Sequence, residues 1–146
     1  MGKNPKLSIV ILSYNTKELL KNCLESLKKV EKELDFEVIV SDNFSSDGSA
    51  ELVETSYPWV KLIRSETNLG FAAGNNKAKK FCRGKYVLFL NSDTVVSENA
   101  LKKTVLYLDE NPTVGALTCK LVLPNGSLDK DARRSFITPW IGVVHI

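Results

Sequence analysis

The chain has 146 residues, of which 43% are apolar and 25% are charged, with a formal net charge of +3. These values are typical of one soluble globular domain over residues 1–146, and so small a charge argues against binding to nucleic acid. No apolar run approaches the roughly 20 residues that span a bilayer, and no signal-peptide pattern opens the sequence, so we expect a cytoplasmic protein. The three cysteines lack a CxxC pair and His145 is the only histidine, which argues against a disulfide framework and a zinc centre.

The first predicted strand is Leu7–Leu12, a short apolar run typical of a strand buried on both faces of a parallel sheet. It leads into the polar loop Ser13–Thr16. Asn15 is placed to cap the following helix, with Glu18 three residues later completing a variant capping box. That helix should bury one apolar stripe, formed by Leu19, Leu20, Cys23, Leu24 and Leu27.

The second predicted strand, Phe36–Val40, repeats the buried-strand pattern. It ends in the polar loop Ser41–Ser49, which carries carboxylates. Ser46 or Asp47 in this loop is placed to cap a short helix over Ser49–Ser56. A second strand end therefore brings polar and acidic side chains to the same edge of the sheet.

Two further strands complete the predicted sheet. Tyr57-Pro58 ends the second helix, and Val60–Arg64 forms the third strand. Because β-α-β crossovers are right-handed in about 98% of cases and require parallel strands, the first three strands should lie in the order 3-2-1. Tyr86–Leu90 would lie on the other side of the first strand, which gives a Rossmann-like α/β fold, mainly a parallel sheet of order 3-2-1-4. In such sheets ligands bind in the crevice at the strand ends, here between the first and fourth strands.

A glycine-rich stretch, Asn68–Asn76, lies between the third and fourth strands and leads into a lysine-rich helix to about Phe81. Gly70 and Gly74 permit close backbone approach to a ligand. The spacing fits neither GxGxxG nor GxxxxGK[ST], which argues against a dinucleotide site and a P-loop. Helix entry and tight packing are the alternative explanation of both glycines.

The fourth strand is the element on which the functional interpretation depends. Tyr86–Leu90 is a continuous apolar run, typical of a strand buried on both faces, and it stops at Asn91-Ser92-Asp93. A carboxylate at that strand end is positioned to hold a metal or a phosphorylated ligand, so Asp93 is the first candidate functional residue. The alternative is that Asn91 and Asp93 only form side-chain turns.

The remaining chain carries a helix, a hairpin and an apolar tail. Ser97 is placed to cap an amphipathic helix that ends before Asn111-Pro112. One face of that helix is formed by Ala100, Leu101, Thr104, Val105 and Leu108. Pro124–Ser127 contains an Asn-Gly pair, a strong hairpin signal, so a small antiparallel addition should be formed by Val114–Leu123 and the residues from Leu128 onward.

Two adjacent arginines and an apolar run close the sequence. Arg133 and Arg134 could hold a pyrophosphate, although a solvated charged segment is the commoner case. Trp140–Ile146 has no cap, turn or polar end, as if the chain were cut within an element. The apolar residues after about Arg134 should form an exposed patch or an unpaired strand edge, so we expect self-association through this tail, as a symmetric homodimer.

Four stretches in this order resemble the nucleotide-sugar half of the family 2 inverting glycosyltransferases, which have the GT-A fold. They are LSIVILSYN at Leu7–Asn15, EVIVSDNFSSDGS at Glu37–Ser49, NLGFAAGNN at Asn68–Asn76 and YVLFLNSDT at Tyr86–Thr94. The sequence is also similar to a rhamnosyltransferase-like branch, whose members have Asn-Pro-Asp-Thr after the fourth strand and a Pro-Asn/Asp-Gly-Ser turn followed by paired arginines.

This resemblance implies roles for particular residues. Those that would lie at the nucleotide are Ser13, Tyr14, Asn15, Asp42, Asn68, Gly70, Asn91 and Ser92. Asp42 would hydrogen-bond the base or ribose. Asp93 would hold Mg²⁺ or Mn²⁺ against the diphosphate, because such a cation stabilises the charge that the leaving group accumulates. Arg133 and Arg134 are candidates for a contact with the diphosphate or the sugar.

The implied reaction is transfer of a sugar, with inversion, from a UDP- or dTDP-linked donor to a hydroxyl of a saccharide or lipid-linked acceptor. Cell-surface polysaccharide biosynthesis is the implied setting, with the full-length protein associated with the inner face of the membrane. Two alternatives remain open. The chain could bind a nucleoside diphosphate and metal without transferring a sugar, or it could be an interaction domain of similar architecture that binds no nucleotide.

The sequence departs from the family pattern in three residues and in length. Ser41 stands where aspartate or valine is common, Asn91 replaces the first carboxylate of an Asp-x-Asp, and Ser92 replaces the branch's proline. One carboxylate fewer should weaken metal affinity. Family members continue well beyond this length, into a part that contains the acidic general base and the acceptor surface. We therefore expect a domain that is incomplete at its C-terminal end, and we assign no base.

Overall fold

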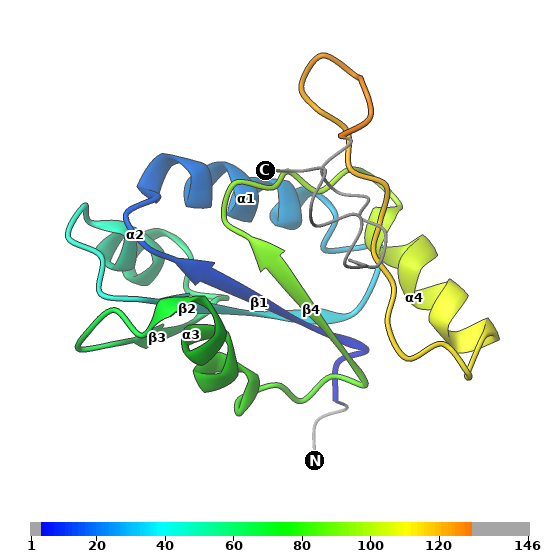
Figure 1. Ribbon diagram of the computed structural model, residues 1–146, viewed down its shortest axis with the longest axis horizontal. Helices are drawn as coiled ribbons and strands as arrows, with labels where there is room; N and C mark the ends of the chain where they lie inside the picture. The colour runs from blue at the N-terminus through cyan, green and yellow to red at the C-terminus, as the bar shows by residue number, and fades with distance from the viewer. Residues whose placement is uncertain (1–3, 130–146) are drawn as a thin grey trace, which may run out of the picture. The chain divides into compact units, whose positions relative to one another are not determined.

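A computed structural model describes residues 4–129, and its centre is a sheet of four parallel strands. The strands are β1 (Leu7–Ser13), β2 (Phe36–Asp42), β3 (Lys61–Arg64) and β4 (Tyr86–Asn91). They lie in the order β3-β2-β1-β4 (Figure 1). The register places Ser13 beside Asp42 and Leu12 beside Asn91. The predicted α/β class and the strand order 3-2-1-4 are confirmed.

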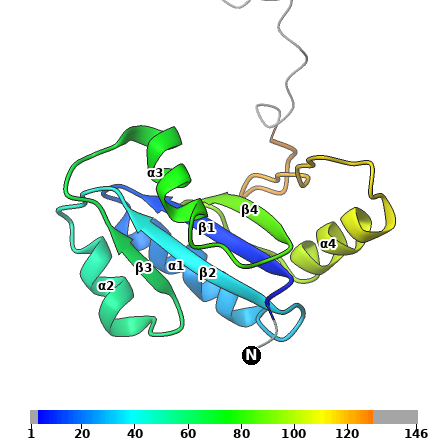
Figure 2. The ribbon, with the colours of Figure 1, turned by 90° about the horizontal axis from the view of Figure 1, so that it is seen from below.

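Helices cover the two faces of this sheet. They are α1 (Lys17–Lys29), α2 (Ser49–Ser56), α3 (Gly70–Lys79) and α4 (Ala100–Glu110). Figure 2 shows α3 on one face of the sheet and α1 and α2 on the other. Among residues 4–129, no helix is both long and apolar enough to cross a membrane.

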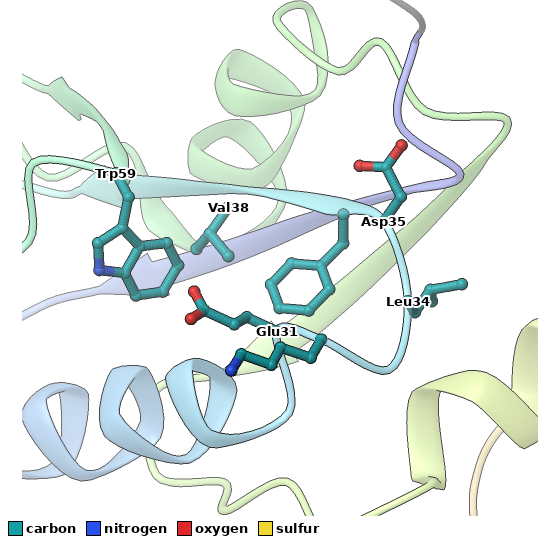
Figure 3. A pocket seen from close by; sticks show the side chains of 7 residues that line it. Glu31, Leu34, Asp35, Val38 and Trp59 are labelled. Carbon is teal, nitrogen blue, oxygen red and sulfur yellow. The ribbon is translucent and has the colours of Figure 1, made fainter.

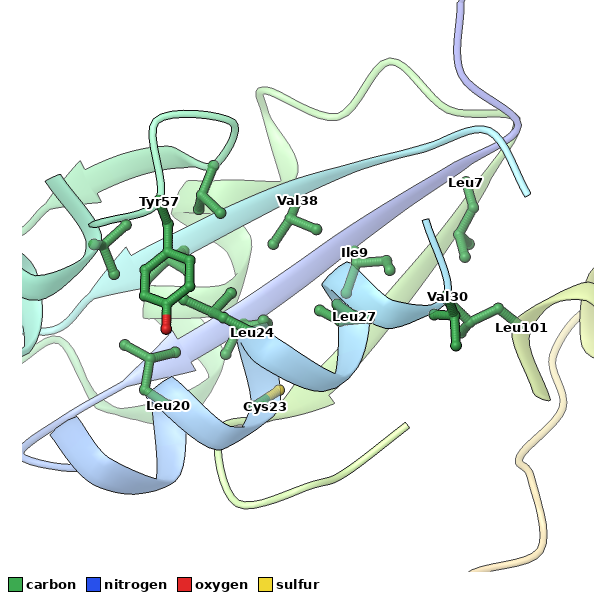
Figure 4. Close-up of a cluster of buried hydrophobic side chains, with 14 of the residues drawn as sticks. Leu7, Ile9, Leu20, Cys23, Leu24, Leu27, Val30, Val38, Tyr57 and Leu101 are labelled. Carbon is green, nitrogen blue, oxygen red and sulfur yellow. The ribbon is translucent and has the colours of Figure 1, made fainter. Parts of the chain in front are cut away.

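The larger core lies between the sheet and α1. Four residues of α1 are fully buried against the sheet: Leu20, Cys23, Leu24 and Leu27 (Figure 4). Burying each leucine contributes roughly 1.5–3 kcal/mol, so this stripe fixes α1 on the sheet. Leu19, which we predicted to share the stripe, is 47% exposed. The contact face of α1 is therefore narrower than the apolar pattern suggested. Leu101 and Val105 of α4 belong to the same cluster.

The opposite face of the sheet is covered only in part. Val10 and Ile39 pack there against Ala78 of α3. Val87 and Phe89 of β4 are exposed, whereas the alternate residues of that strand pack against the larger core. The prediction that Tyr86–Leu90 is buried on both faces is therefore wrong. The reason is that α3 packs on β1 and β2, and in the described residues it leaves this face of β4 open.

The three predicted helix caps are also wrong. Gly48, not Ser46 or Asp47, is the N-cap of α2. Thr16, not Asn15, is the N-cap of α1, and no side-chain bond caps the helix. The Asn15 side chain instead accepts a hydrogen bond from the backbone N–H of Ser46. Asn99 is the N-cap of α4, and Ser97 contributes only its backbone carbonyl to the first turn.

Residues 112–129 belong to a second unit, separate from the unit that ends at Asn111. Val122 and Leu128 form an antiparallel bridge around the Asn-Gly turn, where the N–H of Leu123 donates to the carbonyl of Ser127 at 2.9 Å. The predicted hairpin is confirmed. Of the strand predicted at Val114–Leu123, the bridge includes only Val122. Arg133, Arg134 and the apolar tail lie outside the described residues.

Candidate functional site

The carboxyl ends of β1, β2 and β4 bring most of the predicted site residues to one edge of the sheet. Ser13 ends β1, Asp42 ends β2 and Asn91 ends β4. Ser13 is buried, and its carbonyl accepts a hydrogen bond from the N–H of Asn43 at 2.8 Å. Because parallel strands end at the same edge, the loops that follow these three residues are neighbours.

Asp42 is the buried carboxylate of this edge. It is 4% exposed, and its Oδ2 accepts a hydrogen bond from the N–H of Ser45 at 3.0 Å. Its Oδ1 is buried and has no hydrogen-bond partner among the described residues. Leaving a buried acceptor without a partner disfavours the fold by about 1–3 kcal/mol. The described residues thus leave Oδ1 without the hydrogen-bond donor that a buried carboxylate oxygen needs.

Asn15 joins the loop after β1 to the loop after β2. Its backbone N–H donates to the Ser45 hydroxyl at 3.0 Å, and its side-chain oxygen accepts from the N–H of Ser46 at 2.8 Å. Asn15 has a φ of 53°, a left-handed conformation that asparagine adopts more readily than most residues. The predicted nucleoside residue therefore has a clear structural role between two loops of the site.

Asp47 strengthens the same connection between the two loops. Its carboxylate accepts from the N–H of Lys17 at 2.8 Å and from the N–H of Ser49 at 3.0 Å, so it binds the first N–H groups of both α1 and α2. Desolvation raises the pKa of Asp47, but hydrogen bonds from the Ser49 hydroxyl and from these N–H groups lower it by more, so the pKa lies below its usual value. The charged form of Asp47 therefore holds the loops together at neutral pH.

Two exposed aromatic side chains lie on these connected loops. Tyr14 is 48% exposed and Phe44 is 57% exposed. Phe44 has a φ of 73°, which is an outlier for a bulky residue. The sequence pointed to Tyr14 but not to Phe44. The missed signal was an aromatic residue inside a loop otherwise made of Asp, Asn, Ser and Gly.

Asn43 attaches the loop before α3 to the end of β2. Its buried side chain donates through Nδ2 to Asn68 Oδ1 at 2.7 Å and accepts through Oδ1 from the N–H of Leu69 at 2.9 Å. Asn68 Oδ1 also accepts from the N–H of Gly70 at 2.8 Å. Two predicted residues, Asn68 and Gly70, are thus held at this edge by a residue that we did not predict.

The two glycines of this stretch differ in their surroundings. Gly70 has a φ of 74°, a region that favours glycine, and beyond its own neighbouring backbone no described atom lies within 4 Å of where a Cβ would be. At Gly74 a Cβ would lie 2.5 Å from Leu12 Cδ1. The close approach of α3 to β1 therefore explains Gly74, whereas the space beside Gly70 is open.

The turn after β4 carries the candidate metal ligand. The N–H of Thr94 donates to the carbonyl of Asn91 at 3.2 Å and closes the turn, in which Asp93 is exposed and Ser92 is buried. Among residues 4–129, no group of three or more His, Cys, Asp or Glu side chains could hold a metal. Asp93 would then be a single protein carboxylate. That donor set fits Mg²⁺ or Mn²⁺ bound mainly by phosphate oxygens and water.

Cys23 lies beneath this turn, with its Sγ 3.9 Å from the carbonyl oxygen of Asn91. Burial and the charge of Asp93 raise the pKa of its thiol to about 12. The thiol is therefore protonated at neutral pH in the free protein.

A hollow of about 400 Å³ lies at the other end of β2. Its lining residues are Glu31, Lys32, Leu34, Asp35, Phe36, Val38 and Trp59 (Figure 3). Phe36 is the first residue of β2, whereas Asp42 is the last. None of the predicted site residues lines this hollow, and ligands of parallel sheets bind at the carboxyl ends of the strands. The hollow is therefore separate from the candidate site.

Several known proteins with a similar sequence or fold are glycosyltransferases. The chain is 38% identical over 102 residues to the glycosyltransferase YfnE of Bacillus subtilis (strain 168), a match that covers 68% of this chain and 26% of YfnE. The Staphylococcus aureus TarS fragment 1–349, solved with UDP-GlcNAc, is 32% identical with a TM-score of 0.65, over 73% of this chain and 32% of that structure. TarS is a poly(ribitol-phosphate) beta-N-acetylglucosaminyltransferase, and the match spans 19% of its full length.

A second solved enzyme has the same arrangement of elements. The mannosyltransferase PcManGT of Pyrobaculum calidifontis, in complex with GDP-Man and Mn²⁺, superposes with a TM-score of 0.71 at 25% identity, over 84% of this chain and 37% of that structure. The fold is thus GT-A-like. The chain spans no more than about two fifths of the length of these relatives. The sequence profile of glycosyl transferase family 2 matches residues 8–140, nearly the whole chain, and the chain therefore belongs to glycosyl transferase family 2.

Proposed function

We propose that this protein transfers a sugar, with inversion, from a nucleoside-diphosphate sugar to an acceptor hydroxyl, and that residues 1–146 are a single domain that binds the nucleotide. The observation that carries the proposal is the Oδ1 atom of Asp42, a buried acceptor without a partner among the described residues. It lies at the strand edge where ligands of such sheets bind. The TarS and PcManGT structures, which contain UDP-GlcNAc and GDP-Man, support a nucleotide sugar as the ligand.

In this proposal the nucleoside lies against the loops after β1 and β2. Asp42 accepts a hydrogen bond from the base or ribose, and the exposed ring of Tyr14 offers a surface for the base. The other residues proposed at the nucleotide are Ser13, Asn15, Asn68, Gly70, Asn91 and Ser92. Ser13 and Asn15 act mainly by holding their loop, because their polar groups already have partners in the fold.

Asp93 is the residue that would hold a divalent cation, Mg²⁺ or Mn²⁺, beside the diphosphate. Such a cation would neutralise charge on the leaving nucleoside diphosphate. In the reaction the acceptor oxygen forms a bond to the anomeric carbon, the bond from that carbon to the diphosphate oxygen breaks, and the hydroxyl proton passes to a base that we do not assign. Arg133 and Arg134, outside the described residues, remain candidates for a contact with the diphosphate or sugar.

Several finer features of the proposal rest on the sequence resemblance. They are a UDP- or dTDP-linked donor, hexosyl or rhamnosyl transfer, a saccharide or lipid-linked acceptor in cell-surface polysaccharide synthesis, and association with the inner face of the membrane. A homodimer formed through the tail is proposed instead from the apolar residues after about Arg134. TarS, which acts on poly(ribitol-phosphate), supports only the general setting. The alternative is that this chain by itself binds the nucleotide without transferring a sugar.

Calorimetry with UDP, dTDP and GDP, in Mn²⁺ and in EDTA, tests the binding site. Asp93→Ala should remove the part of the affinity that depends on Mn²⁺. Asp42→Asn should weaken binding in both buffers by about 1.5–3 kcal/mol, the usual contribution of a hydrogen bond to a charged group. Asp35→Ala, at the opposite end of β2, is the matched control and should bind as the parent does. Unchanged binding in the Asp42 and Asp93 variants would remove both residues from the site.

A transfer assay on the same preparation separates the proposed enzyme from the alternative. Release of nucleoside diphosphate from a donor such as UDP-GlcNAc, dependent on an added saccharide acceptor, would show that the chain is a transferase. Binding without such release would mean that this chain alone is a nucleotide-binding domain.

A further inference from the structure

A chain of three hydroxyl groups joins the end of β1 to the turn after β4. Ser13 Oγ lies 3.0 Å from Thr16 Oγ1, and Thr16 Oγ1 donates to Ser92 Oγ, also at 3.0 Å. Ser13 and Ser92 are buried and Thr16 is partly buried. The bond between Thr16 and Ser92 links residues that are 76 positions apart. It connects the loop proposed for the nucleoside to the turn that carries Asp93.

The direction of the hydrogen bonds follows from the number of hydrogens. Each hydroxyl has one hydrogen to donate. Because Thr16 donates to Ser92, the bond between Ser13 and Thr16 must be donated by Ser13. The hydroxyl hydrogen of Ser92 is then the last in this series of three hydroxyls, and the described residues provide no acceptor for it. Ser92 can therefore donate to an anionic ligand next to Asp93.

The Thr16 hydroxyl makes no hydrogen bond to the first turn of its own helix. Threonine is common at helix N-caps because its oxygen accepts a hydrogen bond from the first turn of the helix. Thr16 is the N-cap of α1, yet its side chain makes no such bond, and only its carbonyl accepts from the N–H of Leu20 at 2.8 Å. Losing the hydroxyl should therefore leave α1 intact and break the two bonds of this hydroxyl, to Ser13 and to Ser92.

The turn after β4 has few other attachments. In the described part of the chain, the bond from Thr16 is the only side-chain hydrogen bond that joins residues 92–95 to another element. The next attachment is at Val96, whose N–H donates to the Ser26 hydroxyl at 3.0 Å. Asp93 lies between these two points, so its position depends on the Thr16 bond.

We propose that Thr16 is a positioning residue for the diphosphate and metal part of the site, and that it acts by holding Ser92, and with it the turn that carries Asp93. This inference rests on the proposed function only for the identity of the ligand. In the described part of the chain Thr16 makes no hydrogen bond to Asp42, and Ser13 keeps its backbone bond from the N–H of Asn43 when the Thr16 hydroxyl is lost. Nucleoside binding that does not involve the metal should therefore change little.

Hydrogen exchange of the free protein tests the structural step without any ligand. Thr16→Val keeps the shape of the side chain but removes the hydroxyl, whereas Thr16→Ser keeps the hydroxyl. The N–H of Thr94, which closes the turn, should exchange about fivefold faster in Thr16→Val and at the parent rate in Thr16→Ser. Thr55→Val, which removes an exposed hydroxyl on α2, is the control. An unchanged Thr94 rate in Thr16→Val would overturn the proposal whatever the ligand is.

Binding of UDP in Mn²⁺ and in EDTA tests the functional step. In Thr16→Val the affinity gained by adding Mn²⁺ should fall about three- to tenfold, while the affinity in EDTA stays at the parent value. Thr16→Ser should restore the gain. Equal losses in both buffers would show that Thr16 acts on the whole fold, and this would contradict the proposal. If the parent protein binds no nucleotide at all, the proposed function fails, and the Thr94 exchange result still decides the structural step.

Discussion

Asn43→Asp is the substitution that tests most sharply how the loop before α3 is held. The wild-type Nδ2 donates to Asn68 Oδ1 at 2.7 Å, and a carboxylate would place an acceptor there instead. Asn68 cannot exchange its oxygen for its NH₂ group without losing the bond from the N–H of Gly70 at 2.8 Å. The bond from the N–H of Leu69 to Oδ1 would remain. One hydrogen bond is therefore lost, and two acceptors face each other between the buried residue 43 and the exposed Asn68.

The loss can be estimated from these contacts. A net hydrogen bond contributes about 0.5–1.5 kcal/mol, and a buried polar atom without its partner disfavours the fold by about 1–3 kcal/mol. We expect Asn43→Asp to lower the free energy of unfolding by about 2 kcal/mol at pH 7. The free energy of unfolding of a small protein falls by about 1–3 kcal/mol for each molar of urea. The urea concentration at the midpoint of unfolding should therefore be about 1 M lower in Asn43→Asp than in the parent.

The pH dependence of the same variant gives an internal check. A protonated carboxyl group carries an O–H donor that can replace Nδ2. The difference in stability between Asn43→Asp and the parent should therefore shrink when urea unfolding is repeated at pH 4. Asn76→Asp, at an exposed position of α3, is the control and should change little. A loss below about 0.5 kcal/mol at pH 7, or a larger loss at pH 4, would refute the role given to Asn43.

Two further predictions concern other parts of the fold. Hydrogen bonds from Lys6 and then Lys85 lower the pKa of Asp109. The charged Asp109 carboxylate therefore stabilises the fold at neutral pH, and this contribution is lost as the pH falls below about 4. Thermal unfolding between pH 7 and pH 2 should therefore depend less on pH in Asp109→Asn, and parallel curves would contradict this. Phe44→Asn should raise the free energy of unfolding by about 1 kcal/mol in urea, because a left-handed conformation is strained for phenylalanine and its ring is 57% exposed. A less stable variant would show that the ring is needed by the fold.

The sheet and the edge that carries the site could be predicted because they depend on local patterns. Leu7–Leu12 and Phe36–Val40 are short apolar runs that end in polar loops, and the crossover rule then orders the strands. The same logic brought Asp42 and Asp93 to one edge. Val87 and Phe89 were misassigned because an apolar run does not indicate which strand has a helix over each of its faces. That depends on where α3 packs.

The interactions that hold the site could not be predicted because they join loops far apart in the sequence. Asn15 looked like a helix cap, but its oxygen is bound by the N–H of Ser46, 31 positions away. Asn43 looked like one more polar loop residue, and its bonds to the loop before α3 arise only when β2 and β3 are paired. Thr16 and Ser92 come together only because β4 lies beside β1. Sequence patterns identify strand ends, whereas these contacts depend on the order of the strands.

The most direct test of the central claim is nuclear magnetic resonance of the labelled chain with UDP or dTDP and a trace of Mn²⁺, which broadens the signals of nearby amides. If Asp93 holds the cation beside a bound diphosphate, broadening that requires the nucleotide should appear at residues 13–15 and 91–94. The amides of Asp35 and Gly84, at the other end of the sheet, should stay sharp. Broadening that is independent of the nucleotide, or that is centred on Asp35 and Gly84, would contradict the account.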